Sequence, residues 1–212
     1  MDTGRISEFI NGYLKEPDEL LKTIRKECED EGVPLIRKET EAFIGTVINL
    51  LRPKRILELG TAAGYSSIFM MKSSENIESI DTIEDWEPRI QKAKKNIAEA
   101  DKNGVINLIE GDAYKIIKGM NETYDLVFID AAKGQYPEYL KESIRLTNKG
   151  AVIIADNIFQ DGDLLESKYI VERRNRTIHK RIREFLDDLM EDKRLLSSIL
   201  PIGDGVTFSI RK

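Results

Sequence analysis

An aspartate and a lysine stand three residues apart in the stretch LVFIDAAKGQYPEYL, residues 126–140. The four apolar residues before Asp130 predict a buried strand, and a strand that fills a core has no structural need for a carboxylate at its tip. A carboxylate can hold a metal ion, and an ammonium group near a dication gives up its proton more easily. Asp130 and Lys133 therefore suit a site in which one residue holds a cation and the other acts as general base toward a hydroxyl group. A solvated surface lysine is the structural alternative for Lys133.

A second acid, Asp156, comes directly after the apolar run AVIIA (151–155) and is followed by Asn157. If the two runs are neighbouring strands, Asp130, Asp156 and Asn157 lie side by side at the carboxyl edge of one sheet. Two carboxylates and an amide oxygen suit Mg²⁺, which would keep further coordination positions for water or substrate oxygens. A zinc site fits less well, because no cysteine or histidine accompanies these residues. Capping of a helix or turn is the structural alternative.

The first loop, ELGTAAGYSS (58–67), contains two glycines that permit a tight turn and the close approach of a ligand to the backbone. It is not the G-x-G-x-x-G dinucleotide motif, because Ala62 stands at the second glycine. Three acids, Asp81, Glu84 and Asp85, follow the next apolar run, where an acid typically accepts hydrogen bonds from ribose hydroxyls. We assign that role to Glu84 and the N-cap of the next helix to Asp85. The loop and the acid together indicate an adenosine-type ligand, whereas the loop alone would also fit a tight turn with no ligand.

These residues need a scaffold that brings strand ends together, and the hydrophobic pattern predicts one. Five short apolar runs alternate with helical stretches, which is typical of an open parallel sheet with helices on both faces. Such sheets bind ligands outside the carboxyl ends of their strands, and an acid follows every run here. The predicted strands are 55–59, 77–80, 105–109, 125–129 and 151–155, and the predicted helices are about 64–73, 86–102, 112–119 and 136–147.

The two ends of the chain follow other patterns. Residues 1–52 have apolar residues at helical spacing and predict about three helices, separated by Pro17 and by the turn Gly32-Val33-Pro34. A long charged helix at about 174–193 precedes two apolar runs around Gly203-Asp204-Gly205. These runs predict an antiparallel hairpin at the edge of the sheet.

The composition suits one soluble globular domain over residues 1–212, with 41% hydrophobic and 33% charged residues. We expect a helical cap over residues 1–52 and an α/β core over 53–212. The single cysteine, Cys28, cannot form an internal disulfide, and the first residues, MDTGRISEFI, lack the apolar segment of a signal peptide. No apolar run approaches the roughly 20 residues that span a bilayer. These features predict a cytoplasmic protein with no membrane partner.

The motifs ILELGTAAGYSS, FIDAAKGQY and IIADN, together with Glu84, resemble the metal-dependent O-methyltransferases of the catechol and caffeoyl-coenzyme A type. The similarity spans essentially residues 33–212. It implies a Rossmann-like class I methyltransferase fold, α/β, with a seven-stranded, mostly parallel sheet, an antiparallel last strand, helices on both faces and extra N-terminal helices. It also implies S-adenosylmethionine as cofactor, Mg²⁺ or Mn²⁺ at Asp130, Asp156 and Asn157, and Lys133 with Asp130 as the catalytic pair. The cofactor-lining residues that it implies are Ile36, Glu58, Gly60, Ser66, Glu84, Asp112, Ala113 and Asp130.

The segment KYIVERRNRTIHKRIR (168–183) has seven Lys or Arg against one Glu, so that the rest of this chain of net charge −5 carries about −11. Such a density of basic residues suits phosphate contacts, although a solvated or dimer-forming helix face fits the charge equally well. Together with DAAKGQY, the segment resembles one bacterial branch of the family, the tRNA 5-hydroxyuridine methyltransferases. That resemblance implies methylation of 5-hydroxyuridine at wobble position 34 of tRNA to 5-methoxyuridine. The residues that it assigns to the anticodon stem-loop are Arg173, Arg174, Arg176, His179, Lys180 and Arg183.

Other functions stay open as alternatives. A small-molecule catechol or caffeoyl-coenzyme A O-methyltransferase shares the motifs, but it has no need of the basic helix, and 7% aromatic residues is few for a pocket that encloses a flat phenol. A nicotinamide-dependent oxidoreductase would have the missing dinucleotide motif. A non-enzymatic RNA-binding protein would not need Asp130, Lys133, Asp156 and Asn157 intact. Because family members usually dimerise, the resemblance also predicts a homodimer.

Overall fold

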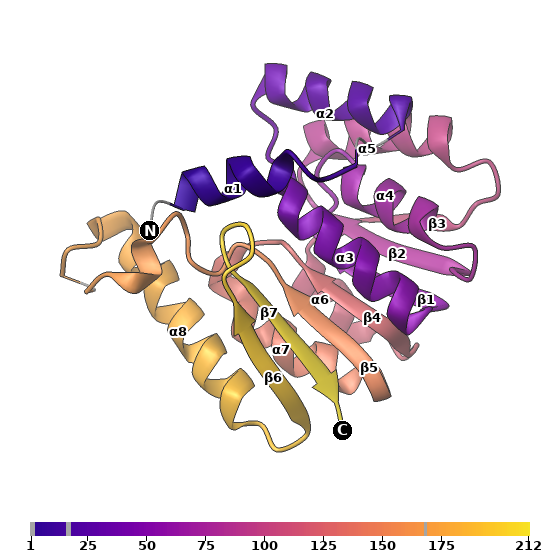
Figure 1. Ribbon diagram of the computed structural model, residues 1–212. Helices are drawn as coiled ribbons and strands as arrows, with labels where there is room; N and C mark the ends of the chain where they lie inside the picture. The colour runs from indigo at the N-terminus through magenta and orange to yellow at the C-terminus, as the bar shows by residue number, and fades with distance from the viewer. Residues whose placement is uncertain (1–2, 16–17, 168) are drawn as a thin grey trace.

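The centre of the molecule is a seven-stranded sheet (Figure 1) in a computed structural model that describes residues 3–15, 18–167 and 169–212. Its strands are β1 (Arg55–Leu59), β2 (Ser79–Glu84), β3 (Ile106–Glu110), β4 (Tyr124–Ile129), β5 (Thr147–Ala155), β6 (Leu195–Leu200) and β7 (Val206–Arg211). They lie in the order β3-β2-β1-β4-β5-β7-β6. β7 pairs antiparallel with β5 and β6, and the other pairs are parallel. The predicted mostly parallel sheet with an antiparallel last strand is confirmed.

Helices cover both faces of this sheet. Successive side chains of a strand point to opposite faces, so Ile56 and Phe128 lie in one core while their neighbours Leu57 and Val127 lie in the other. The helices on the first face are α3 (Lys38–Leu51), α4 (Tyr65–Ser73) and α5 (Glu87–Ala100), and those on the second are α6 (Ala113–Gly119), α7 (Tyr136–Arg145) and α8 (Arg176–Glu191). The apolar runs of the sequence therefore fill two separate cores.

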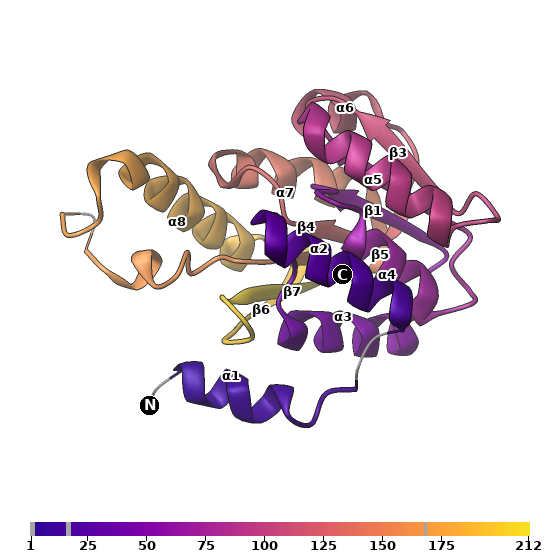
Figure 2. The same cartoon turned by 90° about the horizontal axis from the view of Figure 1, so that it is seen from above.

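Two further helices precede α3. α2 (Glu19–Glu31) buries Leu21, Ile24 and Cys28 and ends at Gly32, which adopts a left-handed conformation with φ 68°. α1 (Thr3–Asn11) lies at the margin of the molecule, beyond α3 (Figure 2). The predicted division at the Gly32 turn is confirmed, whereas the one at Pro17 lies outside the described residues.

The connections on the second face bring distant segments to one edge. A short 3-10 helix, η1 (Lys133–Gln135), joins β4 to α7, and two others, η2 (Asp163–Leu165) and η3 (Arg173–Asn175), lie between β5 and α8. α8 packs against η1 and α7 and buries Ile182, Phe185 and Leu189. The basic helix thus lies beside the loop that follows β4.

β5 begins at Thr147, four residues before the predicted apolar run, because Thr147 already pairs with Tyr124 of β4. None of the helices within the described residues is long and apolar enough to cross a membrane.

Candidate active site

A cavity of about 430 Å³ opens at the carboxyl ends of β1 to β4. The loops after these strands line it together with Asn157, which follows β5, and residues 34–36, which precede α3. Nine predicted site residues meet there, namely Ile36, Gly60, Ser66, Glu84, Asp112, Ala113, Asp130, Lys133 and Asn157. Two others, Glu58 and Asp156, are fully buried and do not line the cavity.

The loop between β1 and α4 comes so close to β4 that only glycine fits at position 60. Gly60 has φ 96°, and a Cβ atom there would collide with the carbonyl oxygen of Asp130. The Gly60 N–H donates to the carbonyl of Ile83 (3.1 Å), and the Asp130 N–H donates to that of Leu59 (2.9 Å). The ends of β1, β2 and β4 are therefore joined by hydrogen bonds, with the glycine backbone open to a ligand.

Glu84, the last residue of β2, binds this loop through its carboxylate. Its Oε2 accepts from the N–H of Ala62 (2.8 Å), and its Oε1 accepts from the N–H of Trp86 (3.2 Å). The carboxylate stays on the cavity lining, where an acid can meet a ribose diol. The prediction that Asp85 caps the next helix is wrong, because Trp86 takes the N-cap position and no side chain caps α5.

Two other predicted cofactor residues have structural partners. Asp112 caps α6, since its Oδ1 accepts from the N–H of Lys115 (2.9 Å). Glu58 lies behind the glycine loop, where its Oε2 accepts from the hydroxyls of Ser67 and Thr82 (2.6 Å from Thr82). Burial raises the pKa of the Glu58 carboxyl to about 7. Glu58 thus supports the loop from inside the core.

The predicted metal ligands are neighbours in space. Asn157 donates through Nδ2 to Oδ1 of Asp130 (3.1 Å), and the Asn157 backbone N–H donates to Oδ1 of Asp156 (2.8 Å). The N–H of Asp156 donates in turn to the carbonyl of Ile129. Asn157 adopts φ 56°, an unusual conformation for a residue other than glycine. The ends of β4 and β5 therefore bring the three side chains together, as the sequence predicts.

The donor set of this cluster fits a divalent cation. Burial raises the pKa of both Asp130 and Asp156, and the charge of Asp130 raises the pKa of Asp156 further. Oδ2 of Asp156 is buried without a hydrogen-bond partner, so a cation would satisfy it and relieve the repulsion between the carboxylates. The Asn157 amide now turns its nitrogen to Asp130 and would have to rotate to offer its oxygen. No group of three or more His, Cys, Asp or Glu side chains suited to a metal occurs in the described part of the chain, so the candidate set is two carboxylates and one amide.

Lys133 lies at the same edge of the cavity. Its Nζ donates to the carbonyl of Asn157 (2.6 Å). Burial lowers the pKa of the Lys133 ammonium, while the carboxylates of Asp130 and Asp204 act in the opposite direction. A lysine that is held beside the carboxylates and is less basic than usual is suited to accept a proton.

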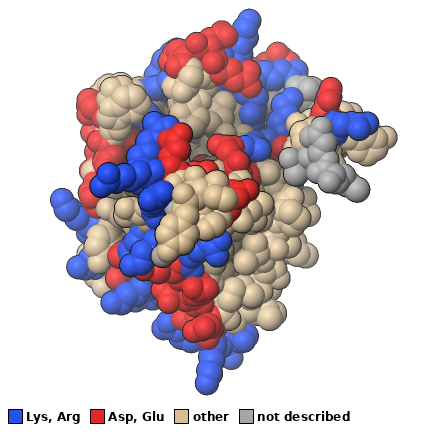
Figure 3. All heavy atoms as spheres, turned by 90° about the vertical axis from the view of Figure 1, so that its left-hand side faces the viewer, with Lys and Arg blue, Asp and Glu red and all other residues tan. Residues whose placement is uncertain are grey.

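The predicted RNA-binding residues lie on η3 and α8, apart from the cavity lining. Arg173, Arg174, Arg176, Lys180 and Arg183 are exposed. On the face that bears α8, Lys and Arg side chains are interspersed with Asp and Glu (Figure 3). Arg174, for example, pairs with Glu172 (2.7 Å), and Lys180 pairs with Glu184 (3.4 Å). The surface is therefore a mixture of charges, and Lys168 of the basic segment lies outside the described residues.

His179 differs from its basic neighbours because it is buried, with 3% exposure. Its Nε2 lies within hydrogen-bond distance of the carbonyl oxygen of Glu166 (3.1 Å) and of Nε of Arg183 (3.3 Å), and the tautomer of the ring decides which of the two it bonds. Arg183 also donates to the carbonyl of Leu164 (2.7 Å). These contacts hold the loop before α8 and leave His179 little surface for an RNA contact.

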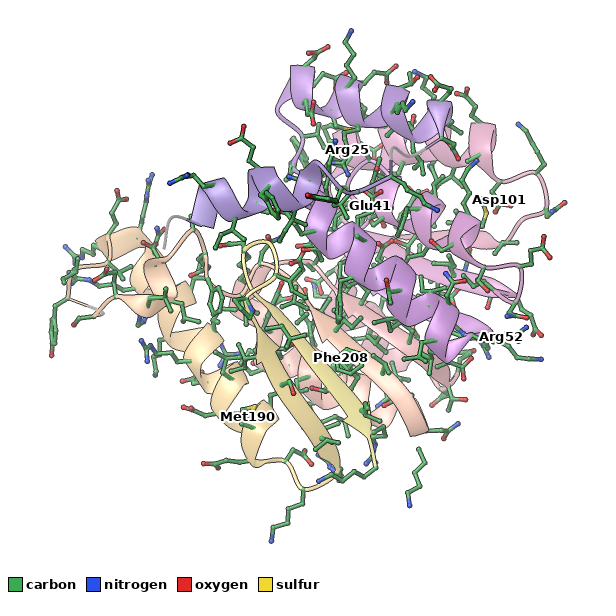
Figure 4. All side chains as sticks on the ribbon, in the orientation of Figure 1. Arg25, Glu41, Arg52, Asp101, Met190 and Phe208 are labelled. Carbon is green, nitrogen blue, oxygen red and sulfur yellow. The ribbon has the colours of Figure 1, made fainter. Side chains whose placement is uncertain are left out.

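A network that the sequence did not reveal holds residues 34–36 over the cavity. Arg25 of α2 forms an ion pair with Glu41 of α3 (2.5 Å; Figure 4). Arg25 also donates to the carbonyl of Ile36 (3.3 Å) and lies over the ring of Tyr65. The Tyr65 hydroxyl donates to Glu41 (2.8 Å). Three helices and the segment before α3 are thereby fixed around Tyr65, which lines the cavity.

Two further residues that sequence analysis missed support Asp156. The Tyr136 hydroxyl donates to the Asp156 carbonyl (3.0 Å), and the Thr40 hydroxyl lies 3.5 Å from Oδ1 of Asp156. Tyr136 belongs to the motif FIDAAKGQY and could have been singled out as its buried aromatic. Thr40 is 116 residues away in the chain, and no local pattern marks it.

Comparisons with known proteins agree with this geometry. Residues 13–212 match the family model described as O-methyltransferase. A catechol O-methyltransferase of Niastella koreensis is 31% identical over 167 residues, which cover 76% of this chain and 76% of that protein. The "Probable caffeoyl-CoA O-methyltransferase 1" of Dictyostelium discoideum is 32% identical over 215 residues, covering 95% of this chain and 90% of that protein.

Solved structures share the fold over nearly the whole chain. The SAH-bound methyltransferase PaMTH1 of Podospora anserina is 25% identical, with a TM-score of 0.86 over 99% of this chain and 95% of that one. An O-methyltransferase of Bacillus cereus, solved in complex with SAH, has the same fold at 23% identity, with a TM-score of 0.85 over 98% of this chain and 97% of that one.

Proposed function

The chain belongs to the O-methyltransferase family, and from that premise we propose that it transfers a methyl group from S-adenosylmethionine, in the presence of Mg²⁺, to the 5-hydroxyl of 5-hydroxyuridine. The acceptor is the wobble position, residue 34, of tRNA, and the product is 5-methoxyuridine. The observation that carries the catalytic part is the cluster of Asp130, Lys133, Asp156 and Asn157 at one edge of the cavity.

The cavity suits the cofactor. Relatives of the same fold are described as SAH-bound, and SAH is S-adenosylmethionine without its transferable methyl group. Glu84 offers a carboxylate to the ribose, and the glycine loop leaves its backbone accessible to the amino-acid part. The remaining contacts would come from Ile36, Ser66, Asp112, Ala113 and Asp130 on the cavity lining.

The protein's own residues then orient the acceptor and move one proton. Asp130, Asp156 and Asn157 would hold Mg²⁺, which supplies, when bound, the positive charge that makes a neighbouring hydroxyl more acidic. Lys133 takes the proton of that hydroxyl as the methyl group is transferred. Methyl transfer of this kind depends mostly on positioning, so these residues need no covalent intermediate.

Charge and chemistry support a tRNA acceptor. The exposed arginines Arg173 and Arg174 lie on η3, and Arg176 begins α8. α8 packs against η1, which begins at Lys133. The side chains of these arginines would contact the phosphates of an anticodon stem-loop. A wobble base is unpaired in its loop and can be turned into a pocket at low cost. Its 5-hydroxyl and 4-carbonyl form a neighbouring oxygen pair, like the two hydroxyls of a catechol.

A small catechol-type acceptor is the second candidate. It is favoured by the relatives named as catechol and caffeoyl-CoA O-methyltransferases. The mixture of charges on the α8 face also weakens the electrostatic argument for RNA. The predicted homodimer stays a prediction for either acceptor.

The test is methyl transfer from labelled S-adenosylmethionine to tRNA with 5-hydroxyuridine at position 34 and, in parallel, to catechol. Each reaction is run with Mg²⁺ and with EDTA, on the wild type and on Asp156→Ala. We expect labelled tRNA only when both the metal and Asp156 are present. Methylated catechol with unlabelled tRNA would make the small-molecule function correct, and full activity in EDTA would exclude the metal site.

A further inference from the structure

Arg181 is the one arginine of the α8 segment that turns inward to the loop bearing Lys133, among the residues that the structure describes. Its Nε donates to the carbonyl oxygen of Gly134 (2.9 Å), the residue next to Lys133. Its two terminal nitrogens contact Glu138 of α7 and Glu184 of α8, the latter at 2.7 Å. The guanidinium group is thereby fixed in a fork of two carboxylates while it holds the η1 backbone.

A second contact from the same face of α8 reaches the other side of the site. Phe185, one turn after Arg181, packs edge-on against Tyr136, with ring centroids 5.4 Å apart. Tyr136 in turn donates to the Asp156 carbonyl. α8 therefore contacts the loop after β4 directly at Gly134, and it reaches Asp156, which follows β5, only through Tyr136 of α7.

Two other side-chain hydrogen bonds tie the turn that follows β4: Lys133 Nζ donates to the Asn157 carbonyl (2.6 Å), and the Tyr139 hydroxyl donates to Oε1 of Gln135 (2.7 Å). Gly134 is only partly buried, and a Cβ atom there would have no neighbour within 4 Å. Within η1, Gln135 donates to the carbonyl of Ala132 (2.9 Å), a bond inside the turn itself. Because Gly134 has no side chain to pack, hydrogen bonds to groups outside the turn, those of Lys133 and Arg181 among them, help to fix the position of Lys133.

We infer that Arg181 is a positioning residue for the methyl-transfer reaction: it holds the Gly134 carbonyl and so keeps the Lys133 ammonium at the strand-end carboxylates. The role of Lys133 rests on the function proposed above, whereas the restraint on the loop does not. Displacement of a reacting group by about 1 Å can cost up to ~100-fold in rate. α8 thus does more than offer a charged surface, because its inner face sets the position of Lys133, the proposed general base.

The experiment compares Arg181→Lys with Arg145→Lys. Arg145 is a matched control because its guanidinium also binds one carboxylate, Glu142 (2.6 Å), and the backbone carbonyls of Met120 (2.8 Å) and Ile117 (2.7 Å), at the opposite end of α7. Hydrogen–deuterium exchange is measured on the peptide that covers residues 131–136. Turnover is measured with tRNA bearing 5-hydroxyuridine and with catechol, while the concentration of S-adenosylmethionine is varied up to saturation.

We expect faster exchange of this peptide in Arg181→Lys than in the wild type or in Arg145→Lys. We also expect kcat to fall about tenfold in Arg181→Lys, with KM for S-adenosylmethionine within twofold, and to stay unchanged in Arg145→Lys. Unchanged exchange in Arg181→Lys would overturn the restraint, and unchanged kcat with faster exchange would overturn its role in the reaction. If the wild type methylates neither acceptor, the proposed function fails, while the exchange result still decides whether Arg181 holds the loop.

Discussion

Glu58 is a carboxyl group with no exposed surface, held between β1, β2 and α4 by the hydroxyls of Ser67 and Thr82. Its other oxygen, Oε1, has no hydrogen-bond partner. Burial raises its pKa to about 7, and the charge of Asp130 adds to this effect. Glu58 therefore keeps its proton up to a higher pH in the folded protein than in the unfolded chain.

This shift predicts how stability depends on pH. The pKa of Glu58 is higher in the folded protein than in the unfolded chain. The stabilisation that comes from its bound proton is therefore complete below about pH 4.5 and is lost as the pH rises to about 7. Relative to Glu58→Gln, the wild type should lose up to about 3 kcal/mol of unfolding free energy between those two pH values. Chemical denaturation of both proteins in EDTA across this range measures the difference. A difference that does not change with pH would show that Glu58 is ionised in the folded protein.

Residues of the site differ in how well the sequence reveals them. Asp130 and Asp156 come directly after apolar runs, and Lys133 and Asn157 follow them within three residues, so their common edge could be predicted from strand order alone. Arg181 stands among residues of the same charge, and only the packing of α8 shows that it faces inward. Residue type and spacing identify the candidate residues, whereas contacts between distant segments decide which of them form one site.

The loop between β1 and α4 is the element on which the cavity depends. Gly60→Ala would combine a left-handed backbone with a collision against the Asp130 carbonyl. Gly104→Ala is the matched control, because Gly104 also has a positive φ, 72°, but the methyl group of an alanine there would meet no atom within 4 Å. We expect Gly104→Ala to cost about 1–2 kcal/mol and Gly60→Ala to cost about 1–3 kcal/mol more, as measured by thermal unfolding. Equal losses would mean that the loop moves away from β4 at no cost.

Element boundaries followed from the sequence where the apolar pattern was strong. The strands at 55–59 and 125–129 match β1 and β4 within a residue, and the edge hairpin is present as β6 and β7. β5 extends back into the polar residues TNKG, because a neighbouring strand pairs with Thr147 whatever its polarity. The role of Asp85 was mispredicted because α5 begins one residue later than expected, at Glu87, so that Trp86 takes the N-cap position.

At the scale of the whole molecule, an acidic protein presents a basic segment beside its active site. We expect tRNA affinity to fall steeply with salt, since each phosphate contact releases about one counterion. Arg173→Gln with Arg174→Gln should lower the slope of log affinity against log salt by about 1–2. Fluorescence anisotropy with the anticodon stem-loop measures this slope. Lys193→Gln with Arg194→Gln, which removes two charges beyond the far end of α8, should leave it unchanged, and an equal decrease in both variants would contradict a specific binding face.

We propose that a hydroxyl group loses its proton and receives a methyl group at the strand-end cluster. The most direct test is the single-turnover rate of methyl transfer by Lys133→Met, with SAH affinity measured by calorimetry on the same protein. We predict a fall in rate of about 10²–10⁴-fold with SAH affinity within twofold of the wild type. A rate within threefold of the wild type would contradict the account, because the proton would then leave by a route that does not involve Lys133.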